Sequence, residues 1–492
     1  METVDDVLNN INGLLSTRAN TATDELNLIR EPIIGTYFYT QFRCIMSLIG
    51  LPKNAHQMPG QHEQLHLHSS CLPTNLHIDP REMKRLTANQ LSCFLEKCET
   101  LLDFAWEYLN IGHWKSIKID YRYFYGYICV AKIVLKLRQI YLLNEHCLNE
   151  SETDDSDEDA IETEAQVKSN ESLLPKGMDL ESLQLLIKVA DLACIMCPPI
   201  MNGIASEMAS KLHQLIAPCY SLKWKTLSDD IKSRQRVLIK PIDSAKKIDS
   251  IYCPSLETFQ QLLQLEKPCI ITGAMDHWPA YNPQSNHHWS LEYILSRIGA
   301  RTVAVEIGAK YTDSEWSQNL MTVDSFIDKH WVDGTGKGYI AQQELFQQCT
   351  ELSHDFSIPD YCGLGRTIET DEEINSLGNI VINGWFGPWG TVSPLHFDPY
   401  DNLLAQVVGR KYIRLYSSST EPGSVYPFSD YLLSNTSQVD VESVDVEKFP
   451  MFPSLPYLEC CLEQGQMLYI PKGYWHYVKS LSISFSINFW WT

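Results

Sequence analysis

The sequence lacks the features that would mark an exported or membrane-bound protein. No stretch approaches about 18 consecutive apolar residues, the length that a helical membrane crossing needs. The first residues include Glu2, Asp5 and Asp6 where a secretory leader would be basic, and no continuous apolar segment follows them. We therefore expect no leader and no association with a membrane.

Positive charge is also scarce. Lys and Arg number 39 against 61 Asp and Glu, which leaves a net charge of -22 at pH 7. Such a balance disfavours general affinity for the phosphate backbone of nucleic acids or for anionic lipid, so no direct nucleic-acid binding is expected. A basic protein or peptide is the partner that this charge fits.

Part of the negative charge lies in one run within residues 150–166, in which Lys and Arg are absent. Low hydrophobicity with high charge of one sign is typical of segments that cannot build a core. We interpret the run as a solvated, disordered linker. A docking site for a basic tail is the competing interpretation.

Recognisable zinc motifs are missing as well. The 15 cysteines are odd in number and scattered through apolar surroundings, which indicates reduced thiols. We therefore expect the protein in the nucleus, and in the cytoplasm as a further location. Cys194 and Cys197 form a C-x-x-C with no second pair, and we expect core packing there. The histidines and one cysteine between residues 56 and 77 match no standard zinc spacing and look like a polar loop.

Two periodicities divide what is present. From Asp24 to Ala217 apolar residues recur every three or four positions, as amphipathic helices require. After Pro241, short β-rich runs alternate with turn residues, for example Lys411–Tyr416 and Ser482–Phe489. The sequence therefore predicts an α+β protein, with a helical domain over 1–240 and a β-sandwich or barrel domain over 241–492.

Three residues of the β-rich half suggest a metal centre. His396 and Asp398 are two positions apart, so on a strand both side chains point to the same side. His476 follows a strand and a Pro/Gly turn late in the same half. Two imidazoles and one carboxylate form the facial triad that binds iron(II) and leaves positions open for a cosubstrate and dioxygen.

Other interpretations of these residues are weaker. A hydrogen-bonded His396–Asp398 pair with His476 capping a turn would explain each residue but not their combination. A zinc or manganese cupin isomerase would require more imidazoles, and the β-rich half contains no H-x-H.

Lys411, at the head of a strand, predicts an anion site. A lysine that faces a barrel interior is costly unless it meets an anion, and a carboxylate of 2-oxoglutarate would serve. Tyr339, Ser393 and Asn402 would supply hydroxyl and amide donors around it. The alternative is a surface lysine beside Arg410.

Across residues 242–492 the chain resembles the Jumonji-C (JmjC) oxygenases. The resemblance lies in these segments: Lys267–Pro279, Glu306–Trp316, Asn383–Pro388, Ser393–Asp398, Arg410–Tyr416 and Asn488–Thr492.

The resemblance implies a double-stranded β-helix (cupin) domain that uses iron(II), 2-oxoglutarate and dioxygen. It implies metal ligation by His396, Asp398 and His476, and cosubstrate contacts from Tyr339, Ser393, Asn402 and Lys411. It also suggests four residues near the substrate, although the tryptophans could be core residues and the glutamate a surface one: Glu306, Trp316, Gln342 and Trp385.

Three functions remain from the sequence. Hydroxylation of arginine in a protein would suit Glu306 as a guanidinium partner. Demethylation of lysine on a histone H3 tail would suit an aromatic slot formed by Trp316 and Trp385. In the third, the protein is a scaffold that binds partners through its helical domain. We favour arginine hydroxylation, partly from the resemblance and partly because no zinc pattern of a chromatin-reading domain is visible. Partner binding by the helical domain can coexist with this activity.

Overall fold

The computed structural model describes residues 4–51, 86–112, 116–150, 174, 178–234, 242–308, 312, 316–332, 338–365 and 380–492. The chain forms two compact units, one of Met1–Tyr220 with Ala300–Thr302 and one of Ser221–Gly299 with Val303–Thr492. The expected domain boundary at residue 240 and nearly all of the acidic linker lie outside the described residues, as does the histidine-rich stretch 56–77, so these interpretations stay predictions.

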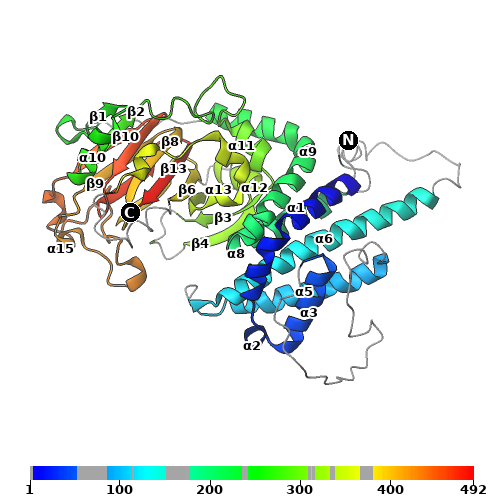
Figure 1. Ribbon diagram of the computed structural model, residues 1–492. Helices are drawn as coiled ribbons and strands as arrows, with labels where there is room; N and C mark the ends of the chain where they lie inside the picture. The colour runs from blue at the N-terminus through cyan, green and yellow to red at the C-terminus, as the bar shows by residue number, and fades with distance from the viewer. Residues whose placement is uncertain are drawn as a thin grey trace. The chain divides into compact units, whose positions relative to one another are not determined.

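The described part of the first unit consists of helices around one long central helix (Figure 1). Their bounds are α1 (Val4–Asn27), α2 (Glu31–Ile34), α3 (Thr36–Leu48), α5 (Ala88–Leu109), α6 (Ile119–Glu150), α8 (Leu180–Met196) and α9 (Ile204–Arg234), the last continuing into the second unit. Helix α6 contacts α1, α3, α5 and α8, and it is buried continuously from Phe124 to Val130. Within the described residues no helix has the length and apolarity to cross a membrane.

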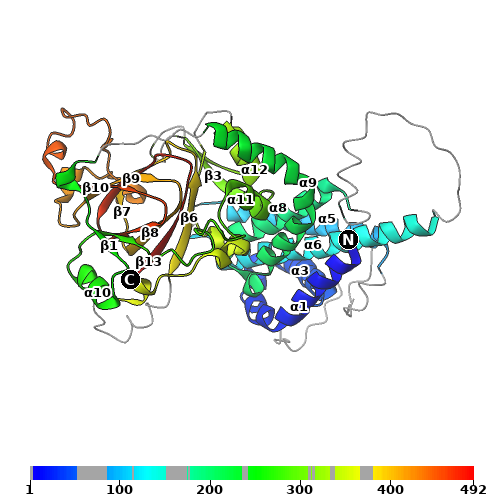
Figure 2. The ribbon, with the colours of Figure 1, turned by 90° about the horizontal axis from the view of Figure 1, so that it is seen from above.

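The second unit contains two β-sheets that curve around a common interior (Figure 2). The larger sheet has the strand order β1-β2-β11-β8-β13-β6-β5-β3-β4, and the smaller has β10-β9-β12-β7. The strands toward the two ends of the larger sheet are β1 (Ser250–Tyr252), β2 (Cys269–Thr272), β3 (Thr302–Ile307), β4 (Ser317–Thr322) and β5 (Gly338–Gln343). The bounds of the remaining strands are β6 (Val381–Gly387), β7 (Val392–Phe397), β8 (Asp401–Val408), β9 (Lys411–Tyr416), β10 (Leu458–Leu462), β11 (Gln466–Ile470), β12 (Trp475–Ser480) and β13 (Ser484–Trp491).

The chain crosses repeatedly between the two sheets. Strands β6, β8, β11 and β13 lie in the larger sheet, whereas β7, β9, β10 and β12 lie in the smaller. Those of the eight that pair with one another are antiparallel. Two facing four-stranded sheets connected in this manner form a double-stranded β-helix, a barrel closed by side chains from both layers. The expected fold class, helical region plus β-helix domain, is confirmed.

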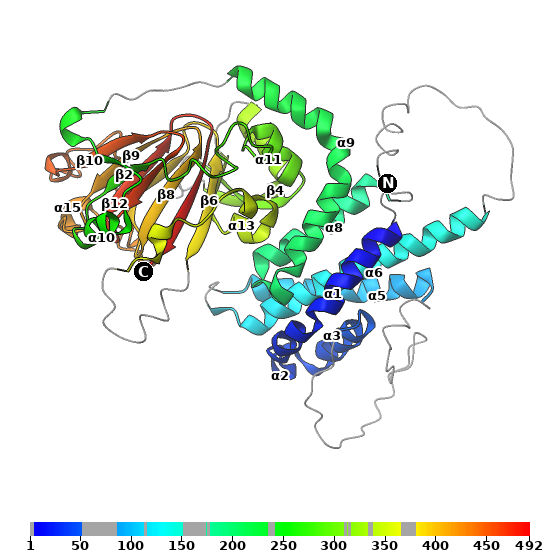
Figure 3. The same cartoon turned by 45° about the horizontal axis from the view of Figure 1, so that its top comes forward.

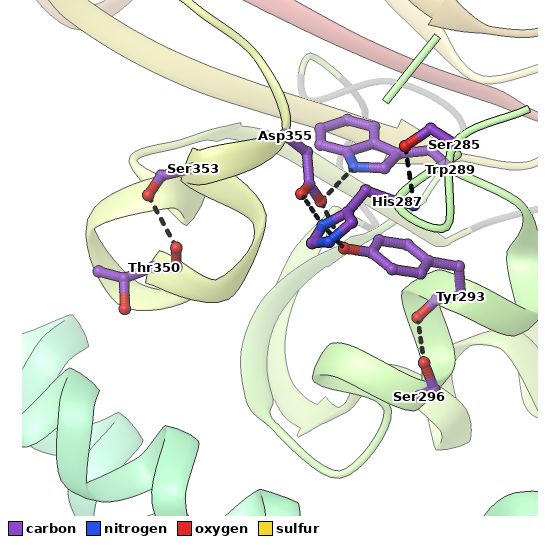
Figure 4. A network of polar contacts seen from close by, with 8 residues as sticks. All are labelled: Ser285, His287, Trp289, Tyr293, Ser296, Thr350, Ser353 and Asp355. Atoms are coloured by element: carbon purple, nitrogen blue, oxygen red, sulfur yellow. Dashed lines mark hydrogen bonds and ion pairs between the residues drawn. The ribbon is translucent and has the colours of Figure 1, made fainter. Parts of the chain in front are cut away.

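Helices and aromatic side chains support the larger sheet from outside. Helix α13 (Leu345–Gln348) contacts β6, and α11 (Leu291–Ile298) lies nearby in Figure 3. The fully buried carboxylate of Asp355 accepts hydrogen bonds from Trp289 Nε1 at 3.0 Å and from the Tyr293 hydroxyl at 2.8 Å, and it contacts His287 Nδ1 at 2.7 Å (Figure 4). This network fixes the layer outside the sheet, and none of its residues lines the pocket described below.

Candidate metal and cosubstrate site

Strands β7 and β12 bring the two predicted imidazole ligands together. The antiparallel register pairs His476 directly with His396. Directly opposed residues of an antiparallel pair point to the same face of the sheet. The two rings accordingly lie with centroids 4.2 Å apart, inside the barrel.

Asp398, which follows β7, completes the group. Its backbone oxygen accepts a hydrogen bond from Gly473 N at 3.0 Å, and its Oδ2 lies 3.4 Å from His476 Nε2. One ligand atom from each of His396, Asp398 and His476 lies within 4.8 Å of the others, and the described residues contain no other such group of three His, Cys, Asp or Glu side chains. The predicted triad is therefore assembled as one facial set.

The hydrogen bonds of both rings leave the correct nitrogen for a metal. His396 Nδ1 lies 2.7 Å from the carbonyl oxygen of Pro394, and His476 Nδ1 lies 3.0 Å from that of Tyr474. A carbonyl can only accept, so each Nδ1 carries the proton and each Nε2 presents its lone pair, the tautomer that a metal-binding histidine needs.

The electrostatics suit a divalent cation. Burial, helped by the neighbouring His476, lowers the pKa of His396 to about 4, so its ring is neutral at physiological pH. Burial alone would raise the pKa of Asp398, but its interactions with the neighbouring His476 and His396 rings outweigh that effect and lower it. Two imidazoles and one carboxylate are the donor set that iron(II) takes in this triad, and the site fits that ion.

One pocket joins the triad to the predicted cosubstrate residues. It is lined by Tyr339, Trp385, Ser393, His396, Asp398, Asn402, Leu404, Lys411, Ile470, His476, Val478 and Asn488. The structure thus places all three proposed ligands and all four proposed cosubstrate residues around one cavity.

Lys411 is the only cation among the residues that line this pocket. Its side chain is 2% exposed, and its Nζ donates to the Tyr339 hydroxyl at 3.2 Å. Burial lowers the pKa of Lys411 to about 7. An amine held in this way gains most from an anionic ligand, because an opposite charge restores the protonated form.

The neutral donors line the same pocket as that amine. Tyr339 lies on β5, and burial raises its pKa, so its hydroxyl stays protonated. The Oδ1 of Asn402, on β8, is the acceptor for Asn488 Nδ2 at 3.4 Å, and Asn488 Oδ1 in turn accepts from Trp385 Nε1 at 2.7 Å. This relay leaves the amide nitrogen of Asn402 as the group that can donate to a carboxylate.

Sequence reasoning missed Asn488 and the apolar wall formed by Leu404, Ile470 and Val478. The alternation of Ser484, Ser486 and Asn488 with apolar residues was visible, but all of β13 is buried. The polar face of this strand therefore faces the interior of the protein, a distinction that a period of two does not make.

The four proposed substrate residues lie in different places. Glu306, on β3, pairs with Tyr339 across the β3–β5 register, and its carboxylate is hydrogen-bonded to Trp316, whose side chain is 38% exposed. Burial raises the pKa of Glu306 to about 7. Trp385 belongs to the pocket lining, whereas Gln342 is exposed, has a left-handed backbone (φ 47°) and is not among the lining residues.

Comparison with known protein families gives one match to the second unit. The model of the Cupin-like domain matches residues 255–492. This range contains every residue assigned above to the metal site and the pocket.

Comparison with individual proteins extends over most of the chain. It is 39% identical to Lysine-specific demethylase 8 of Danio rerio over 404 residues, which cover 81% of this chain and 87% of that protein. It is 36% identical to Lysine-specific demethylase JMJ30 of Arabidopsis thaliana, over 80% of this chain and 85% of that protein. It is 32% identical to Jumonji C domain-containing protein 5 of Drosophila melanogaster, again over 80% and 85%.

Proposed function

Since the chain belongs to the Jumonji-C family of iron(II)- and 2-oxoglutarate-dependent oxygenases, we propose that it hydroxylates arginine side chains in protein substrates. Iron(II), 2-oxoglutarate and dioxygen are the cofactor and cosubstrates of this family. When bound, they supply the oxidising power that inserts one oxygen atom into a substrate C–H bond, with 2-oxoglutarate converted to succinate and carbon dioxide.

The residues of this chain bind and orient the reactants. His396, Asp398 and His476 would hold the iron on one face. Lys411 and the Tyr339 hydroxyl would bind the distal carboxylate of 2-oxoglutarate through charge-assisted hydrogen bonds. Both side chains are buried, and the low polarity of their surroundings strengthens these electrostatic contacts.

The partly buried carboxylate of Glu306 is the observation that supports arginine as the substrate. It lies on β3, directly opposite Tyr339 on the neighbouring strand β5. Its pKa is raised to about 7 because burial penalises the charged form. A guanidinium would restore the charge through two parallel hydrogen bonds, and it stacks well on an aromatic face such as that of Trp316.

The tryptophans favour the same choice over an aromatic cage for a methylated amine. Trp385 donates its indole N–H to Asn488, and its ring lies 5.9 Å from Lys411 Nζ, so it is engaged in the cosubstrate pocket. Of the two tryptophans, Trp316 is the exposed one, and it is hydrogen-bonded to Glu306. One ring and one carboxylate suit a planar guanidinium better than a methylammonium surrounded by several rings.

Demethylation of histone lysine is the second candidate, and the names of two relatives favour it. The proteins of Danio rerio and Arabidopsis thaliana described above are both named lysine-specific demethylases. A role as a scaffold, partner binding through the helical unit and a nuclear location stay predictions.

Mass spectrometry of peptide products separates these functions. The full chain, iron(II) and 2-oxoglutarate would be incubated with a basic peptide containing arginine and with the same peptide containing methyl-lysine. We expect a gain of one oxygen on arginine, which disappears when 2-oxoglutarate is omitted or when Asp398→Ala replaces the wild type. Formaldehyde release from methyl-lysine with unmodified arginine would refute the proposal, and absence of succinate formation under all conditions would support the scaffold.

A further inference from the structure

The segment between β9 and β10, residues 417–457, adds a short extended stretch to the strand that carries His396. Strand β7 is the edge strand of the smaller sheet, beyond β12. Along this edge Ser437 N donates to Leu395 O at 2.8 Å, and Thr436 forms an antiparallel bridge with His396. Strand β7, which carries His396, is therefore paired along both of its edges, with β12 on one and with this stretch on the other.

One residue of this stretch holds the peptide between two metal ligands. The backbone oxygen of Asn435 accepts from Phe397 N at 3.0 Å, and Asn435 Nδ2 donates to Phe397 O at 2.9 Å. Phe397 is the single residue between His396 and Asp398. Its backbone therefore sets the angle between the two ligand side chains.

We propose that Asn435 is a positioning residue for the metal centre. It does not touch the pocket, and it acts by fixing the backbone of Phe397. Strand β7 ends at that residue, and its pairing with Trp475 is the last of the β7–β12 register. Asp398 thus lies directly beyond the end of the regular sheet. There the two hydrogen bonds between Asn435 and Phe397 hold the backbone that the strand pairing no longer holds.

Packing makes the segment a rigid support. The side chain of Phe397 packs edge-on against Trp475, with ring centroids 5.0 Å apart. The Thr436 hydroxyl, which is buried, donates to Asn435 Oδ1 at 3.4 Å and restrains the amide. The segment also contributes these buried side chains to the hydrophobic cluster that contains Leu395: Val425, Val439, Val441, Phe449 and Phe452.

A metal site depends on such support because ligand directions must be held within about half an ångström of the productive geometry. Groups that orient ligands without binding the metal typically contribute roughly 10–100-fold to metal affinity. We therefore expect the loss of the Asn435 amide to weaken metal binding by about tenfold, at the low end of that range, because the backbone half of the contact remains.

The test measures metal binding by the full chain, without 2-oxoglutarate or substrate. The metal-free wild type, Asn435→Ala, Asn435→Asp and Gln438→Ala would each be titrated with cobalt(II). Its visible ligand-field absorption reports both affinity and coordination geometry. Gln438 is the matched control, because its Nε2 also donates to a carbonyl of this segment, that of Pro427 at 3.0 Å, without reaching β7.

We expect the two Asn435 variants to bind cobalt(II) about tenfold more weakly and with an altered spectrum, while Gln438→Ala matches the wild type. Thermal unfolding of the metal-free proteins provides the structural comparison. If both Asn435 variants lower the melting temperature but retain wild-type affinity and spectrum, the role is structural and the proposal fails. If Asn435→Ala does not fold, Asn435→Asp carries the test, since it keeps the size and the oxygen that accepts from Thr436. The outcome does not depend on which substrate the enzyme uses.

Discussion

Replacing Lys411 by methionine should make the metal-free protein more stable while it abolishes cosubstrate binding. The side chain is 2% exposed, and its pKa falls from 10.5 to about 7 because burial penalises the ammonium form. Methionine has a similar length, is flexible and needs no charge or hydrogen bond. The substitution thus removes the burial penalty and the anion-binding group together.

The size of the stability gain follows from the pKa difference. Each pH unit between the unfolded and folded values corresponds to about 1.4 kcal/mol, so the buried amine costs at most about 4 kcal/mol at pH 7. Loss of the hydrogen bond to the Tyr339 hydroxyl offsets about 1 kcal/mol of this. We expect Lys411→Met to raise the free energy of unfolding by up to about 3 kcal/mol at pH 7.

The pH dependence provides a check that packing alone would not reproduce. Between pH 7 and 10.5 the unfolded chain keeps the Lys411 proton that the folded chain has released, so the wild type gains stability as the pH rises through this range. At pH 9 the penalty has fallen to about 2 kcal/mol, and below pH 7 it is constant. The advantage of Lys411→Met should therefore shrink by about 2 kcal/mol from pH 7 to pH 9.

Denaturant unfolding followed by tryptophan fluorescence would measure this change, since ten of the 12 tryptophans lie after residue 220. Calorimetric titration of the metal-loaded proteins with 2-oxoglutarate would measure binding. In the wild type, affinity should fall as the pH rises above about 7, because the amine loses its proton. A Lys411→Met protein that is less stable at pH 7, or that retains cosubstrate affinity, would refute the reasoning.

Four further changes test separate parts of the site. His476→Ala should weaken metal binding by more than the roughly 10–100-fold typical of residues outside the ligand set, as calorimetry with manganese(II) would show. Glu306→Gln should lower kcat/KM for an arginine peptide by about tenfold or more. Wild-type activity should fall below about pH 7, as this carboxyl becomes protonated, and the variant should not show this fall. Unchanged kinetics would exclude Glu306 from substrate binding. Gly387→Ala would place a Cβ 2.6 Å from Tyr339 Cδ2, so KM for 2-oxoglutarate should rise about tenfold in steady-state assays while metal affinity stays constant. Gly409→Ala would combine a φ of +75° with a Cβ 1.8 Å from Ile483 O and should cost about 2–4 kcal/mol in denaturant unfolding, whereas a change below about 0.5 kcal/mol would contradict the turn geometry.

The sequence was sufficient where local periodicity and chemistry coincide. The H-x-D spacing indicated that His396 and Asp398 share a side, and the position of Lys411 at the head of a strand indicated a side chain facing the barrel interior, where the structure buries it. Both are properties of single segments. The run Lys411–Tyr416 coincides with β9 for the same reason.

Residues that depend on cross-strand register could not be found in this way. Asn488 lines the pocket because β13 pairs with β6 and β8, which brings it to the side-chain amide of Asn402 and the indole N–H of Trp385. Asn435 lies in a segment without regular periodicity, and nothing in its neighbours indicates that it contacts Phe397. In both cases the partner is tens of residues distant and the contact is set by folding of the whole domain.

The arrangement of strands also separates the reaction from the choice of substrate. The proposed metal and cosubstrate residues lie on or directly after β5, β7, β8, β9 and β12, whereas Glu306 lies on β3 and Trp316 immediately before β4. Both reactions insert oxygen into a C–H bond in the same manner. The bond belongs to an arginine side-chain carbon in one reaction and to a methyl carbon on the lysine nitrogen in the other, whose product then releases formaldehyde. The two candidate functions therefore differ only in which C–H bond is presented to the oxidant. Changes at Glu306 and Trp316 should alter the ratio of kcat/KM between the two peptide classes, while changes at Lys411 should lower both equally.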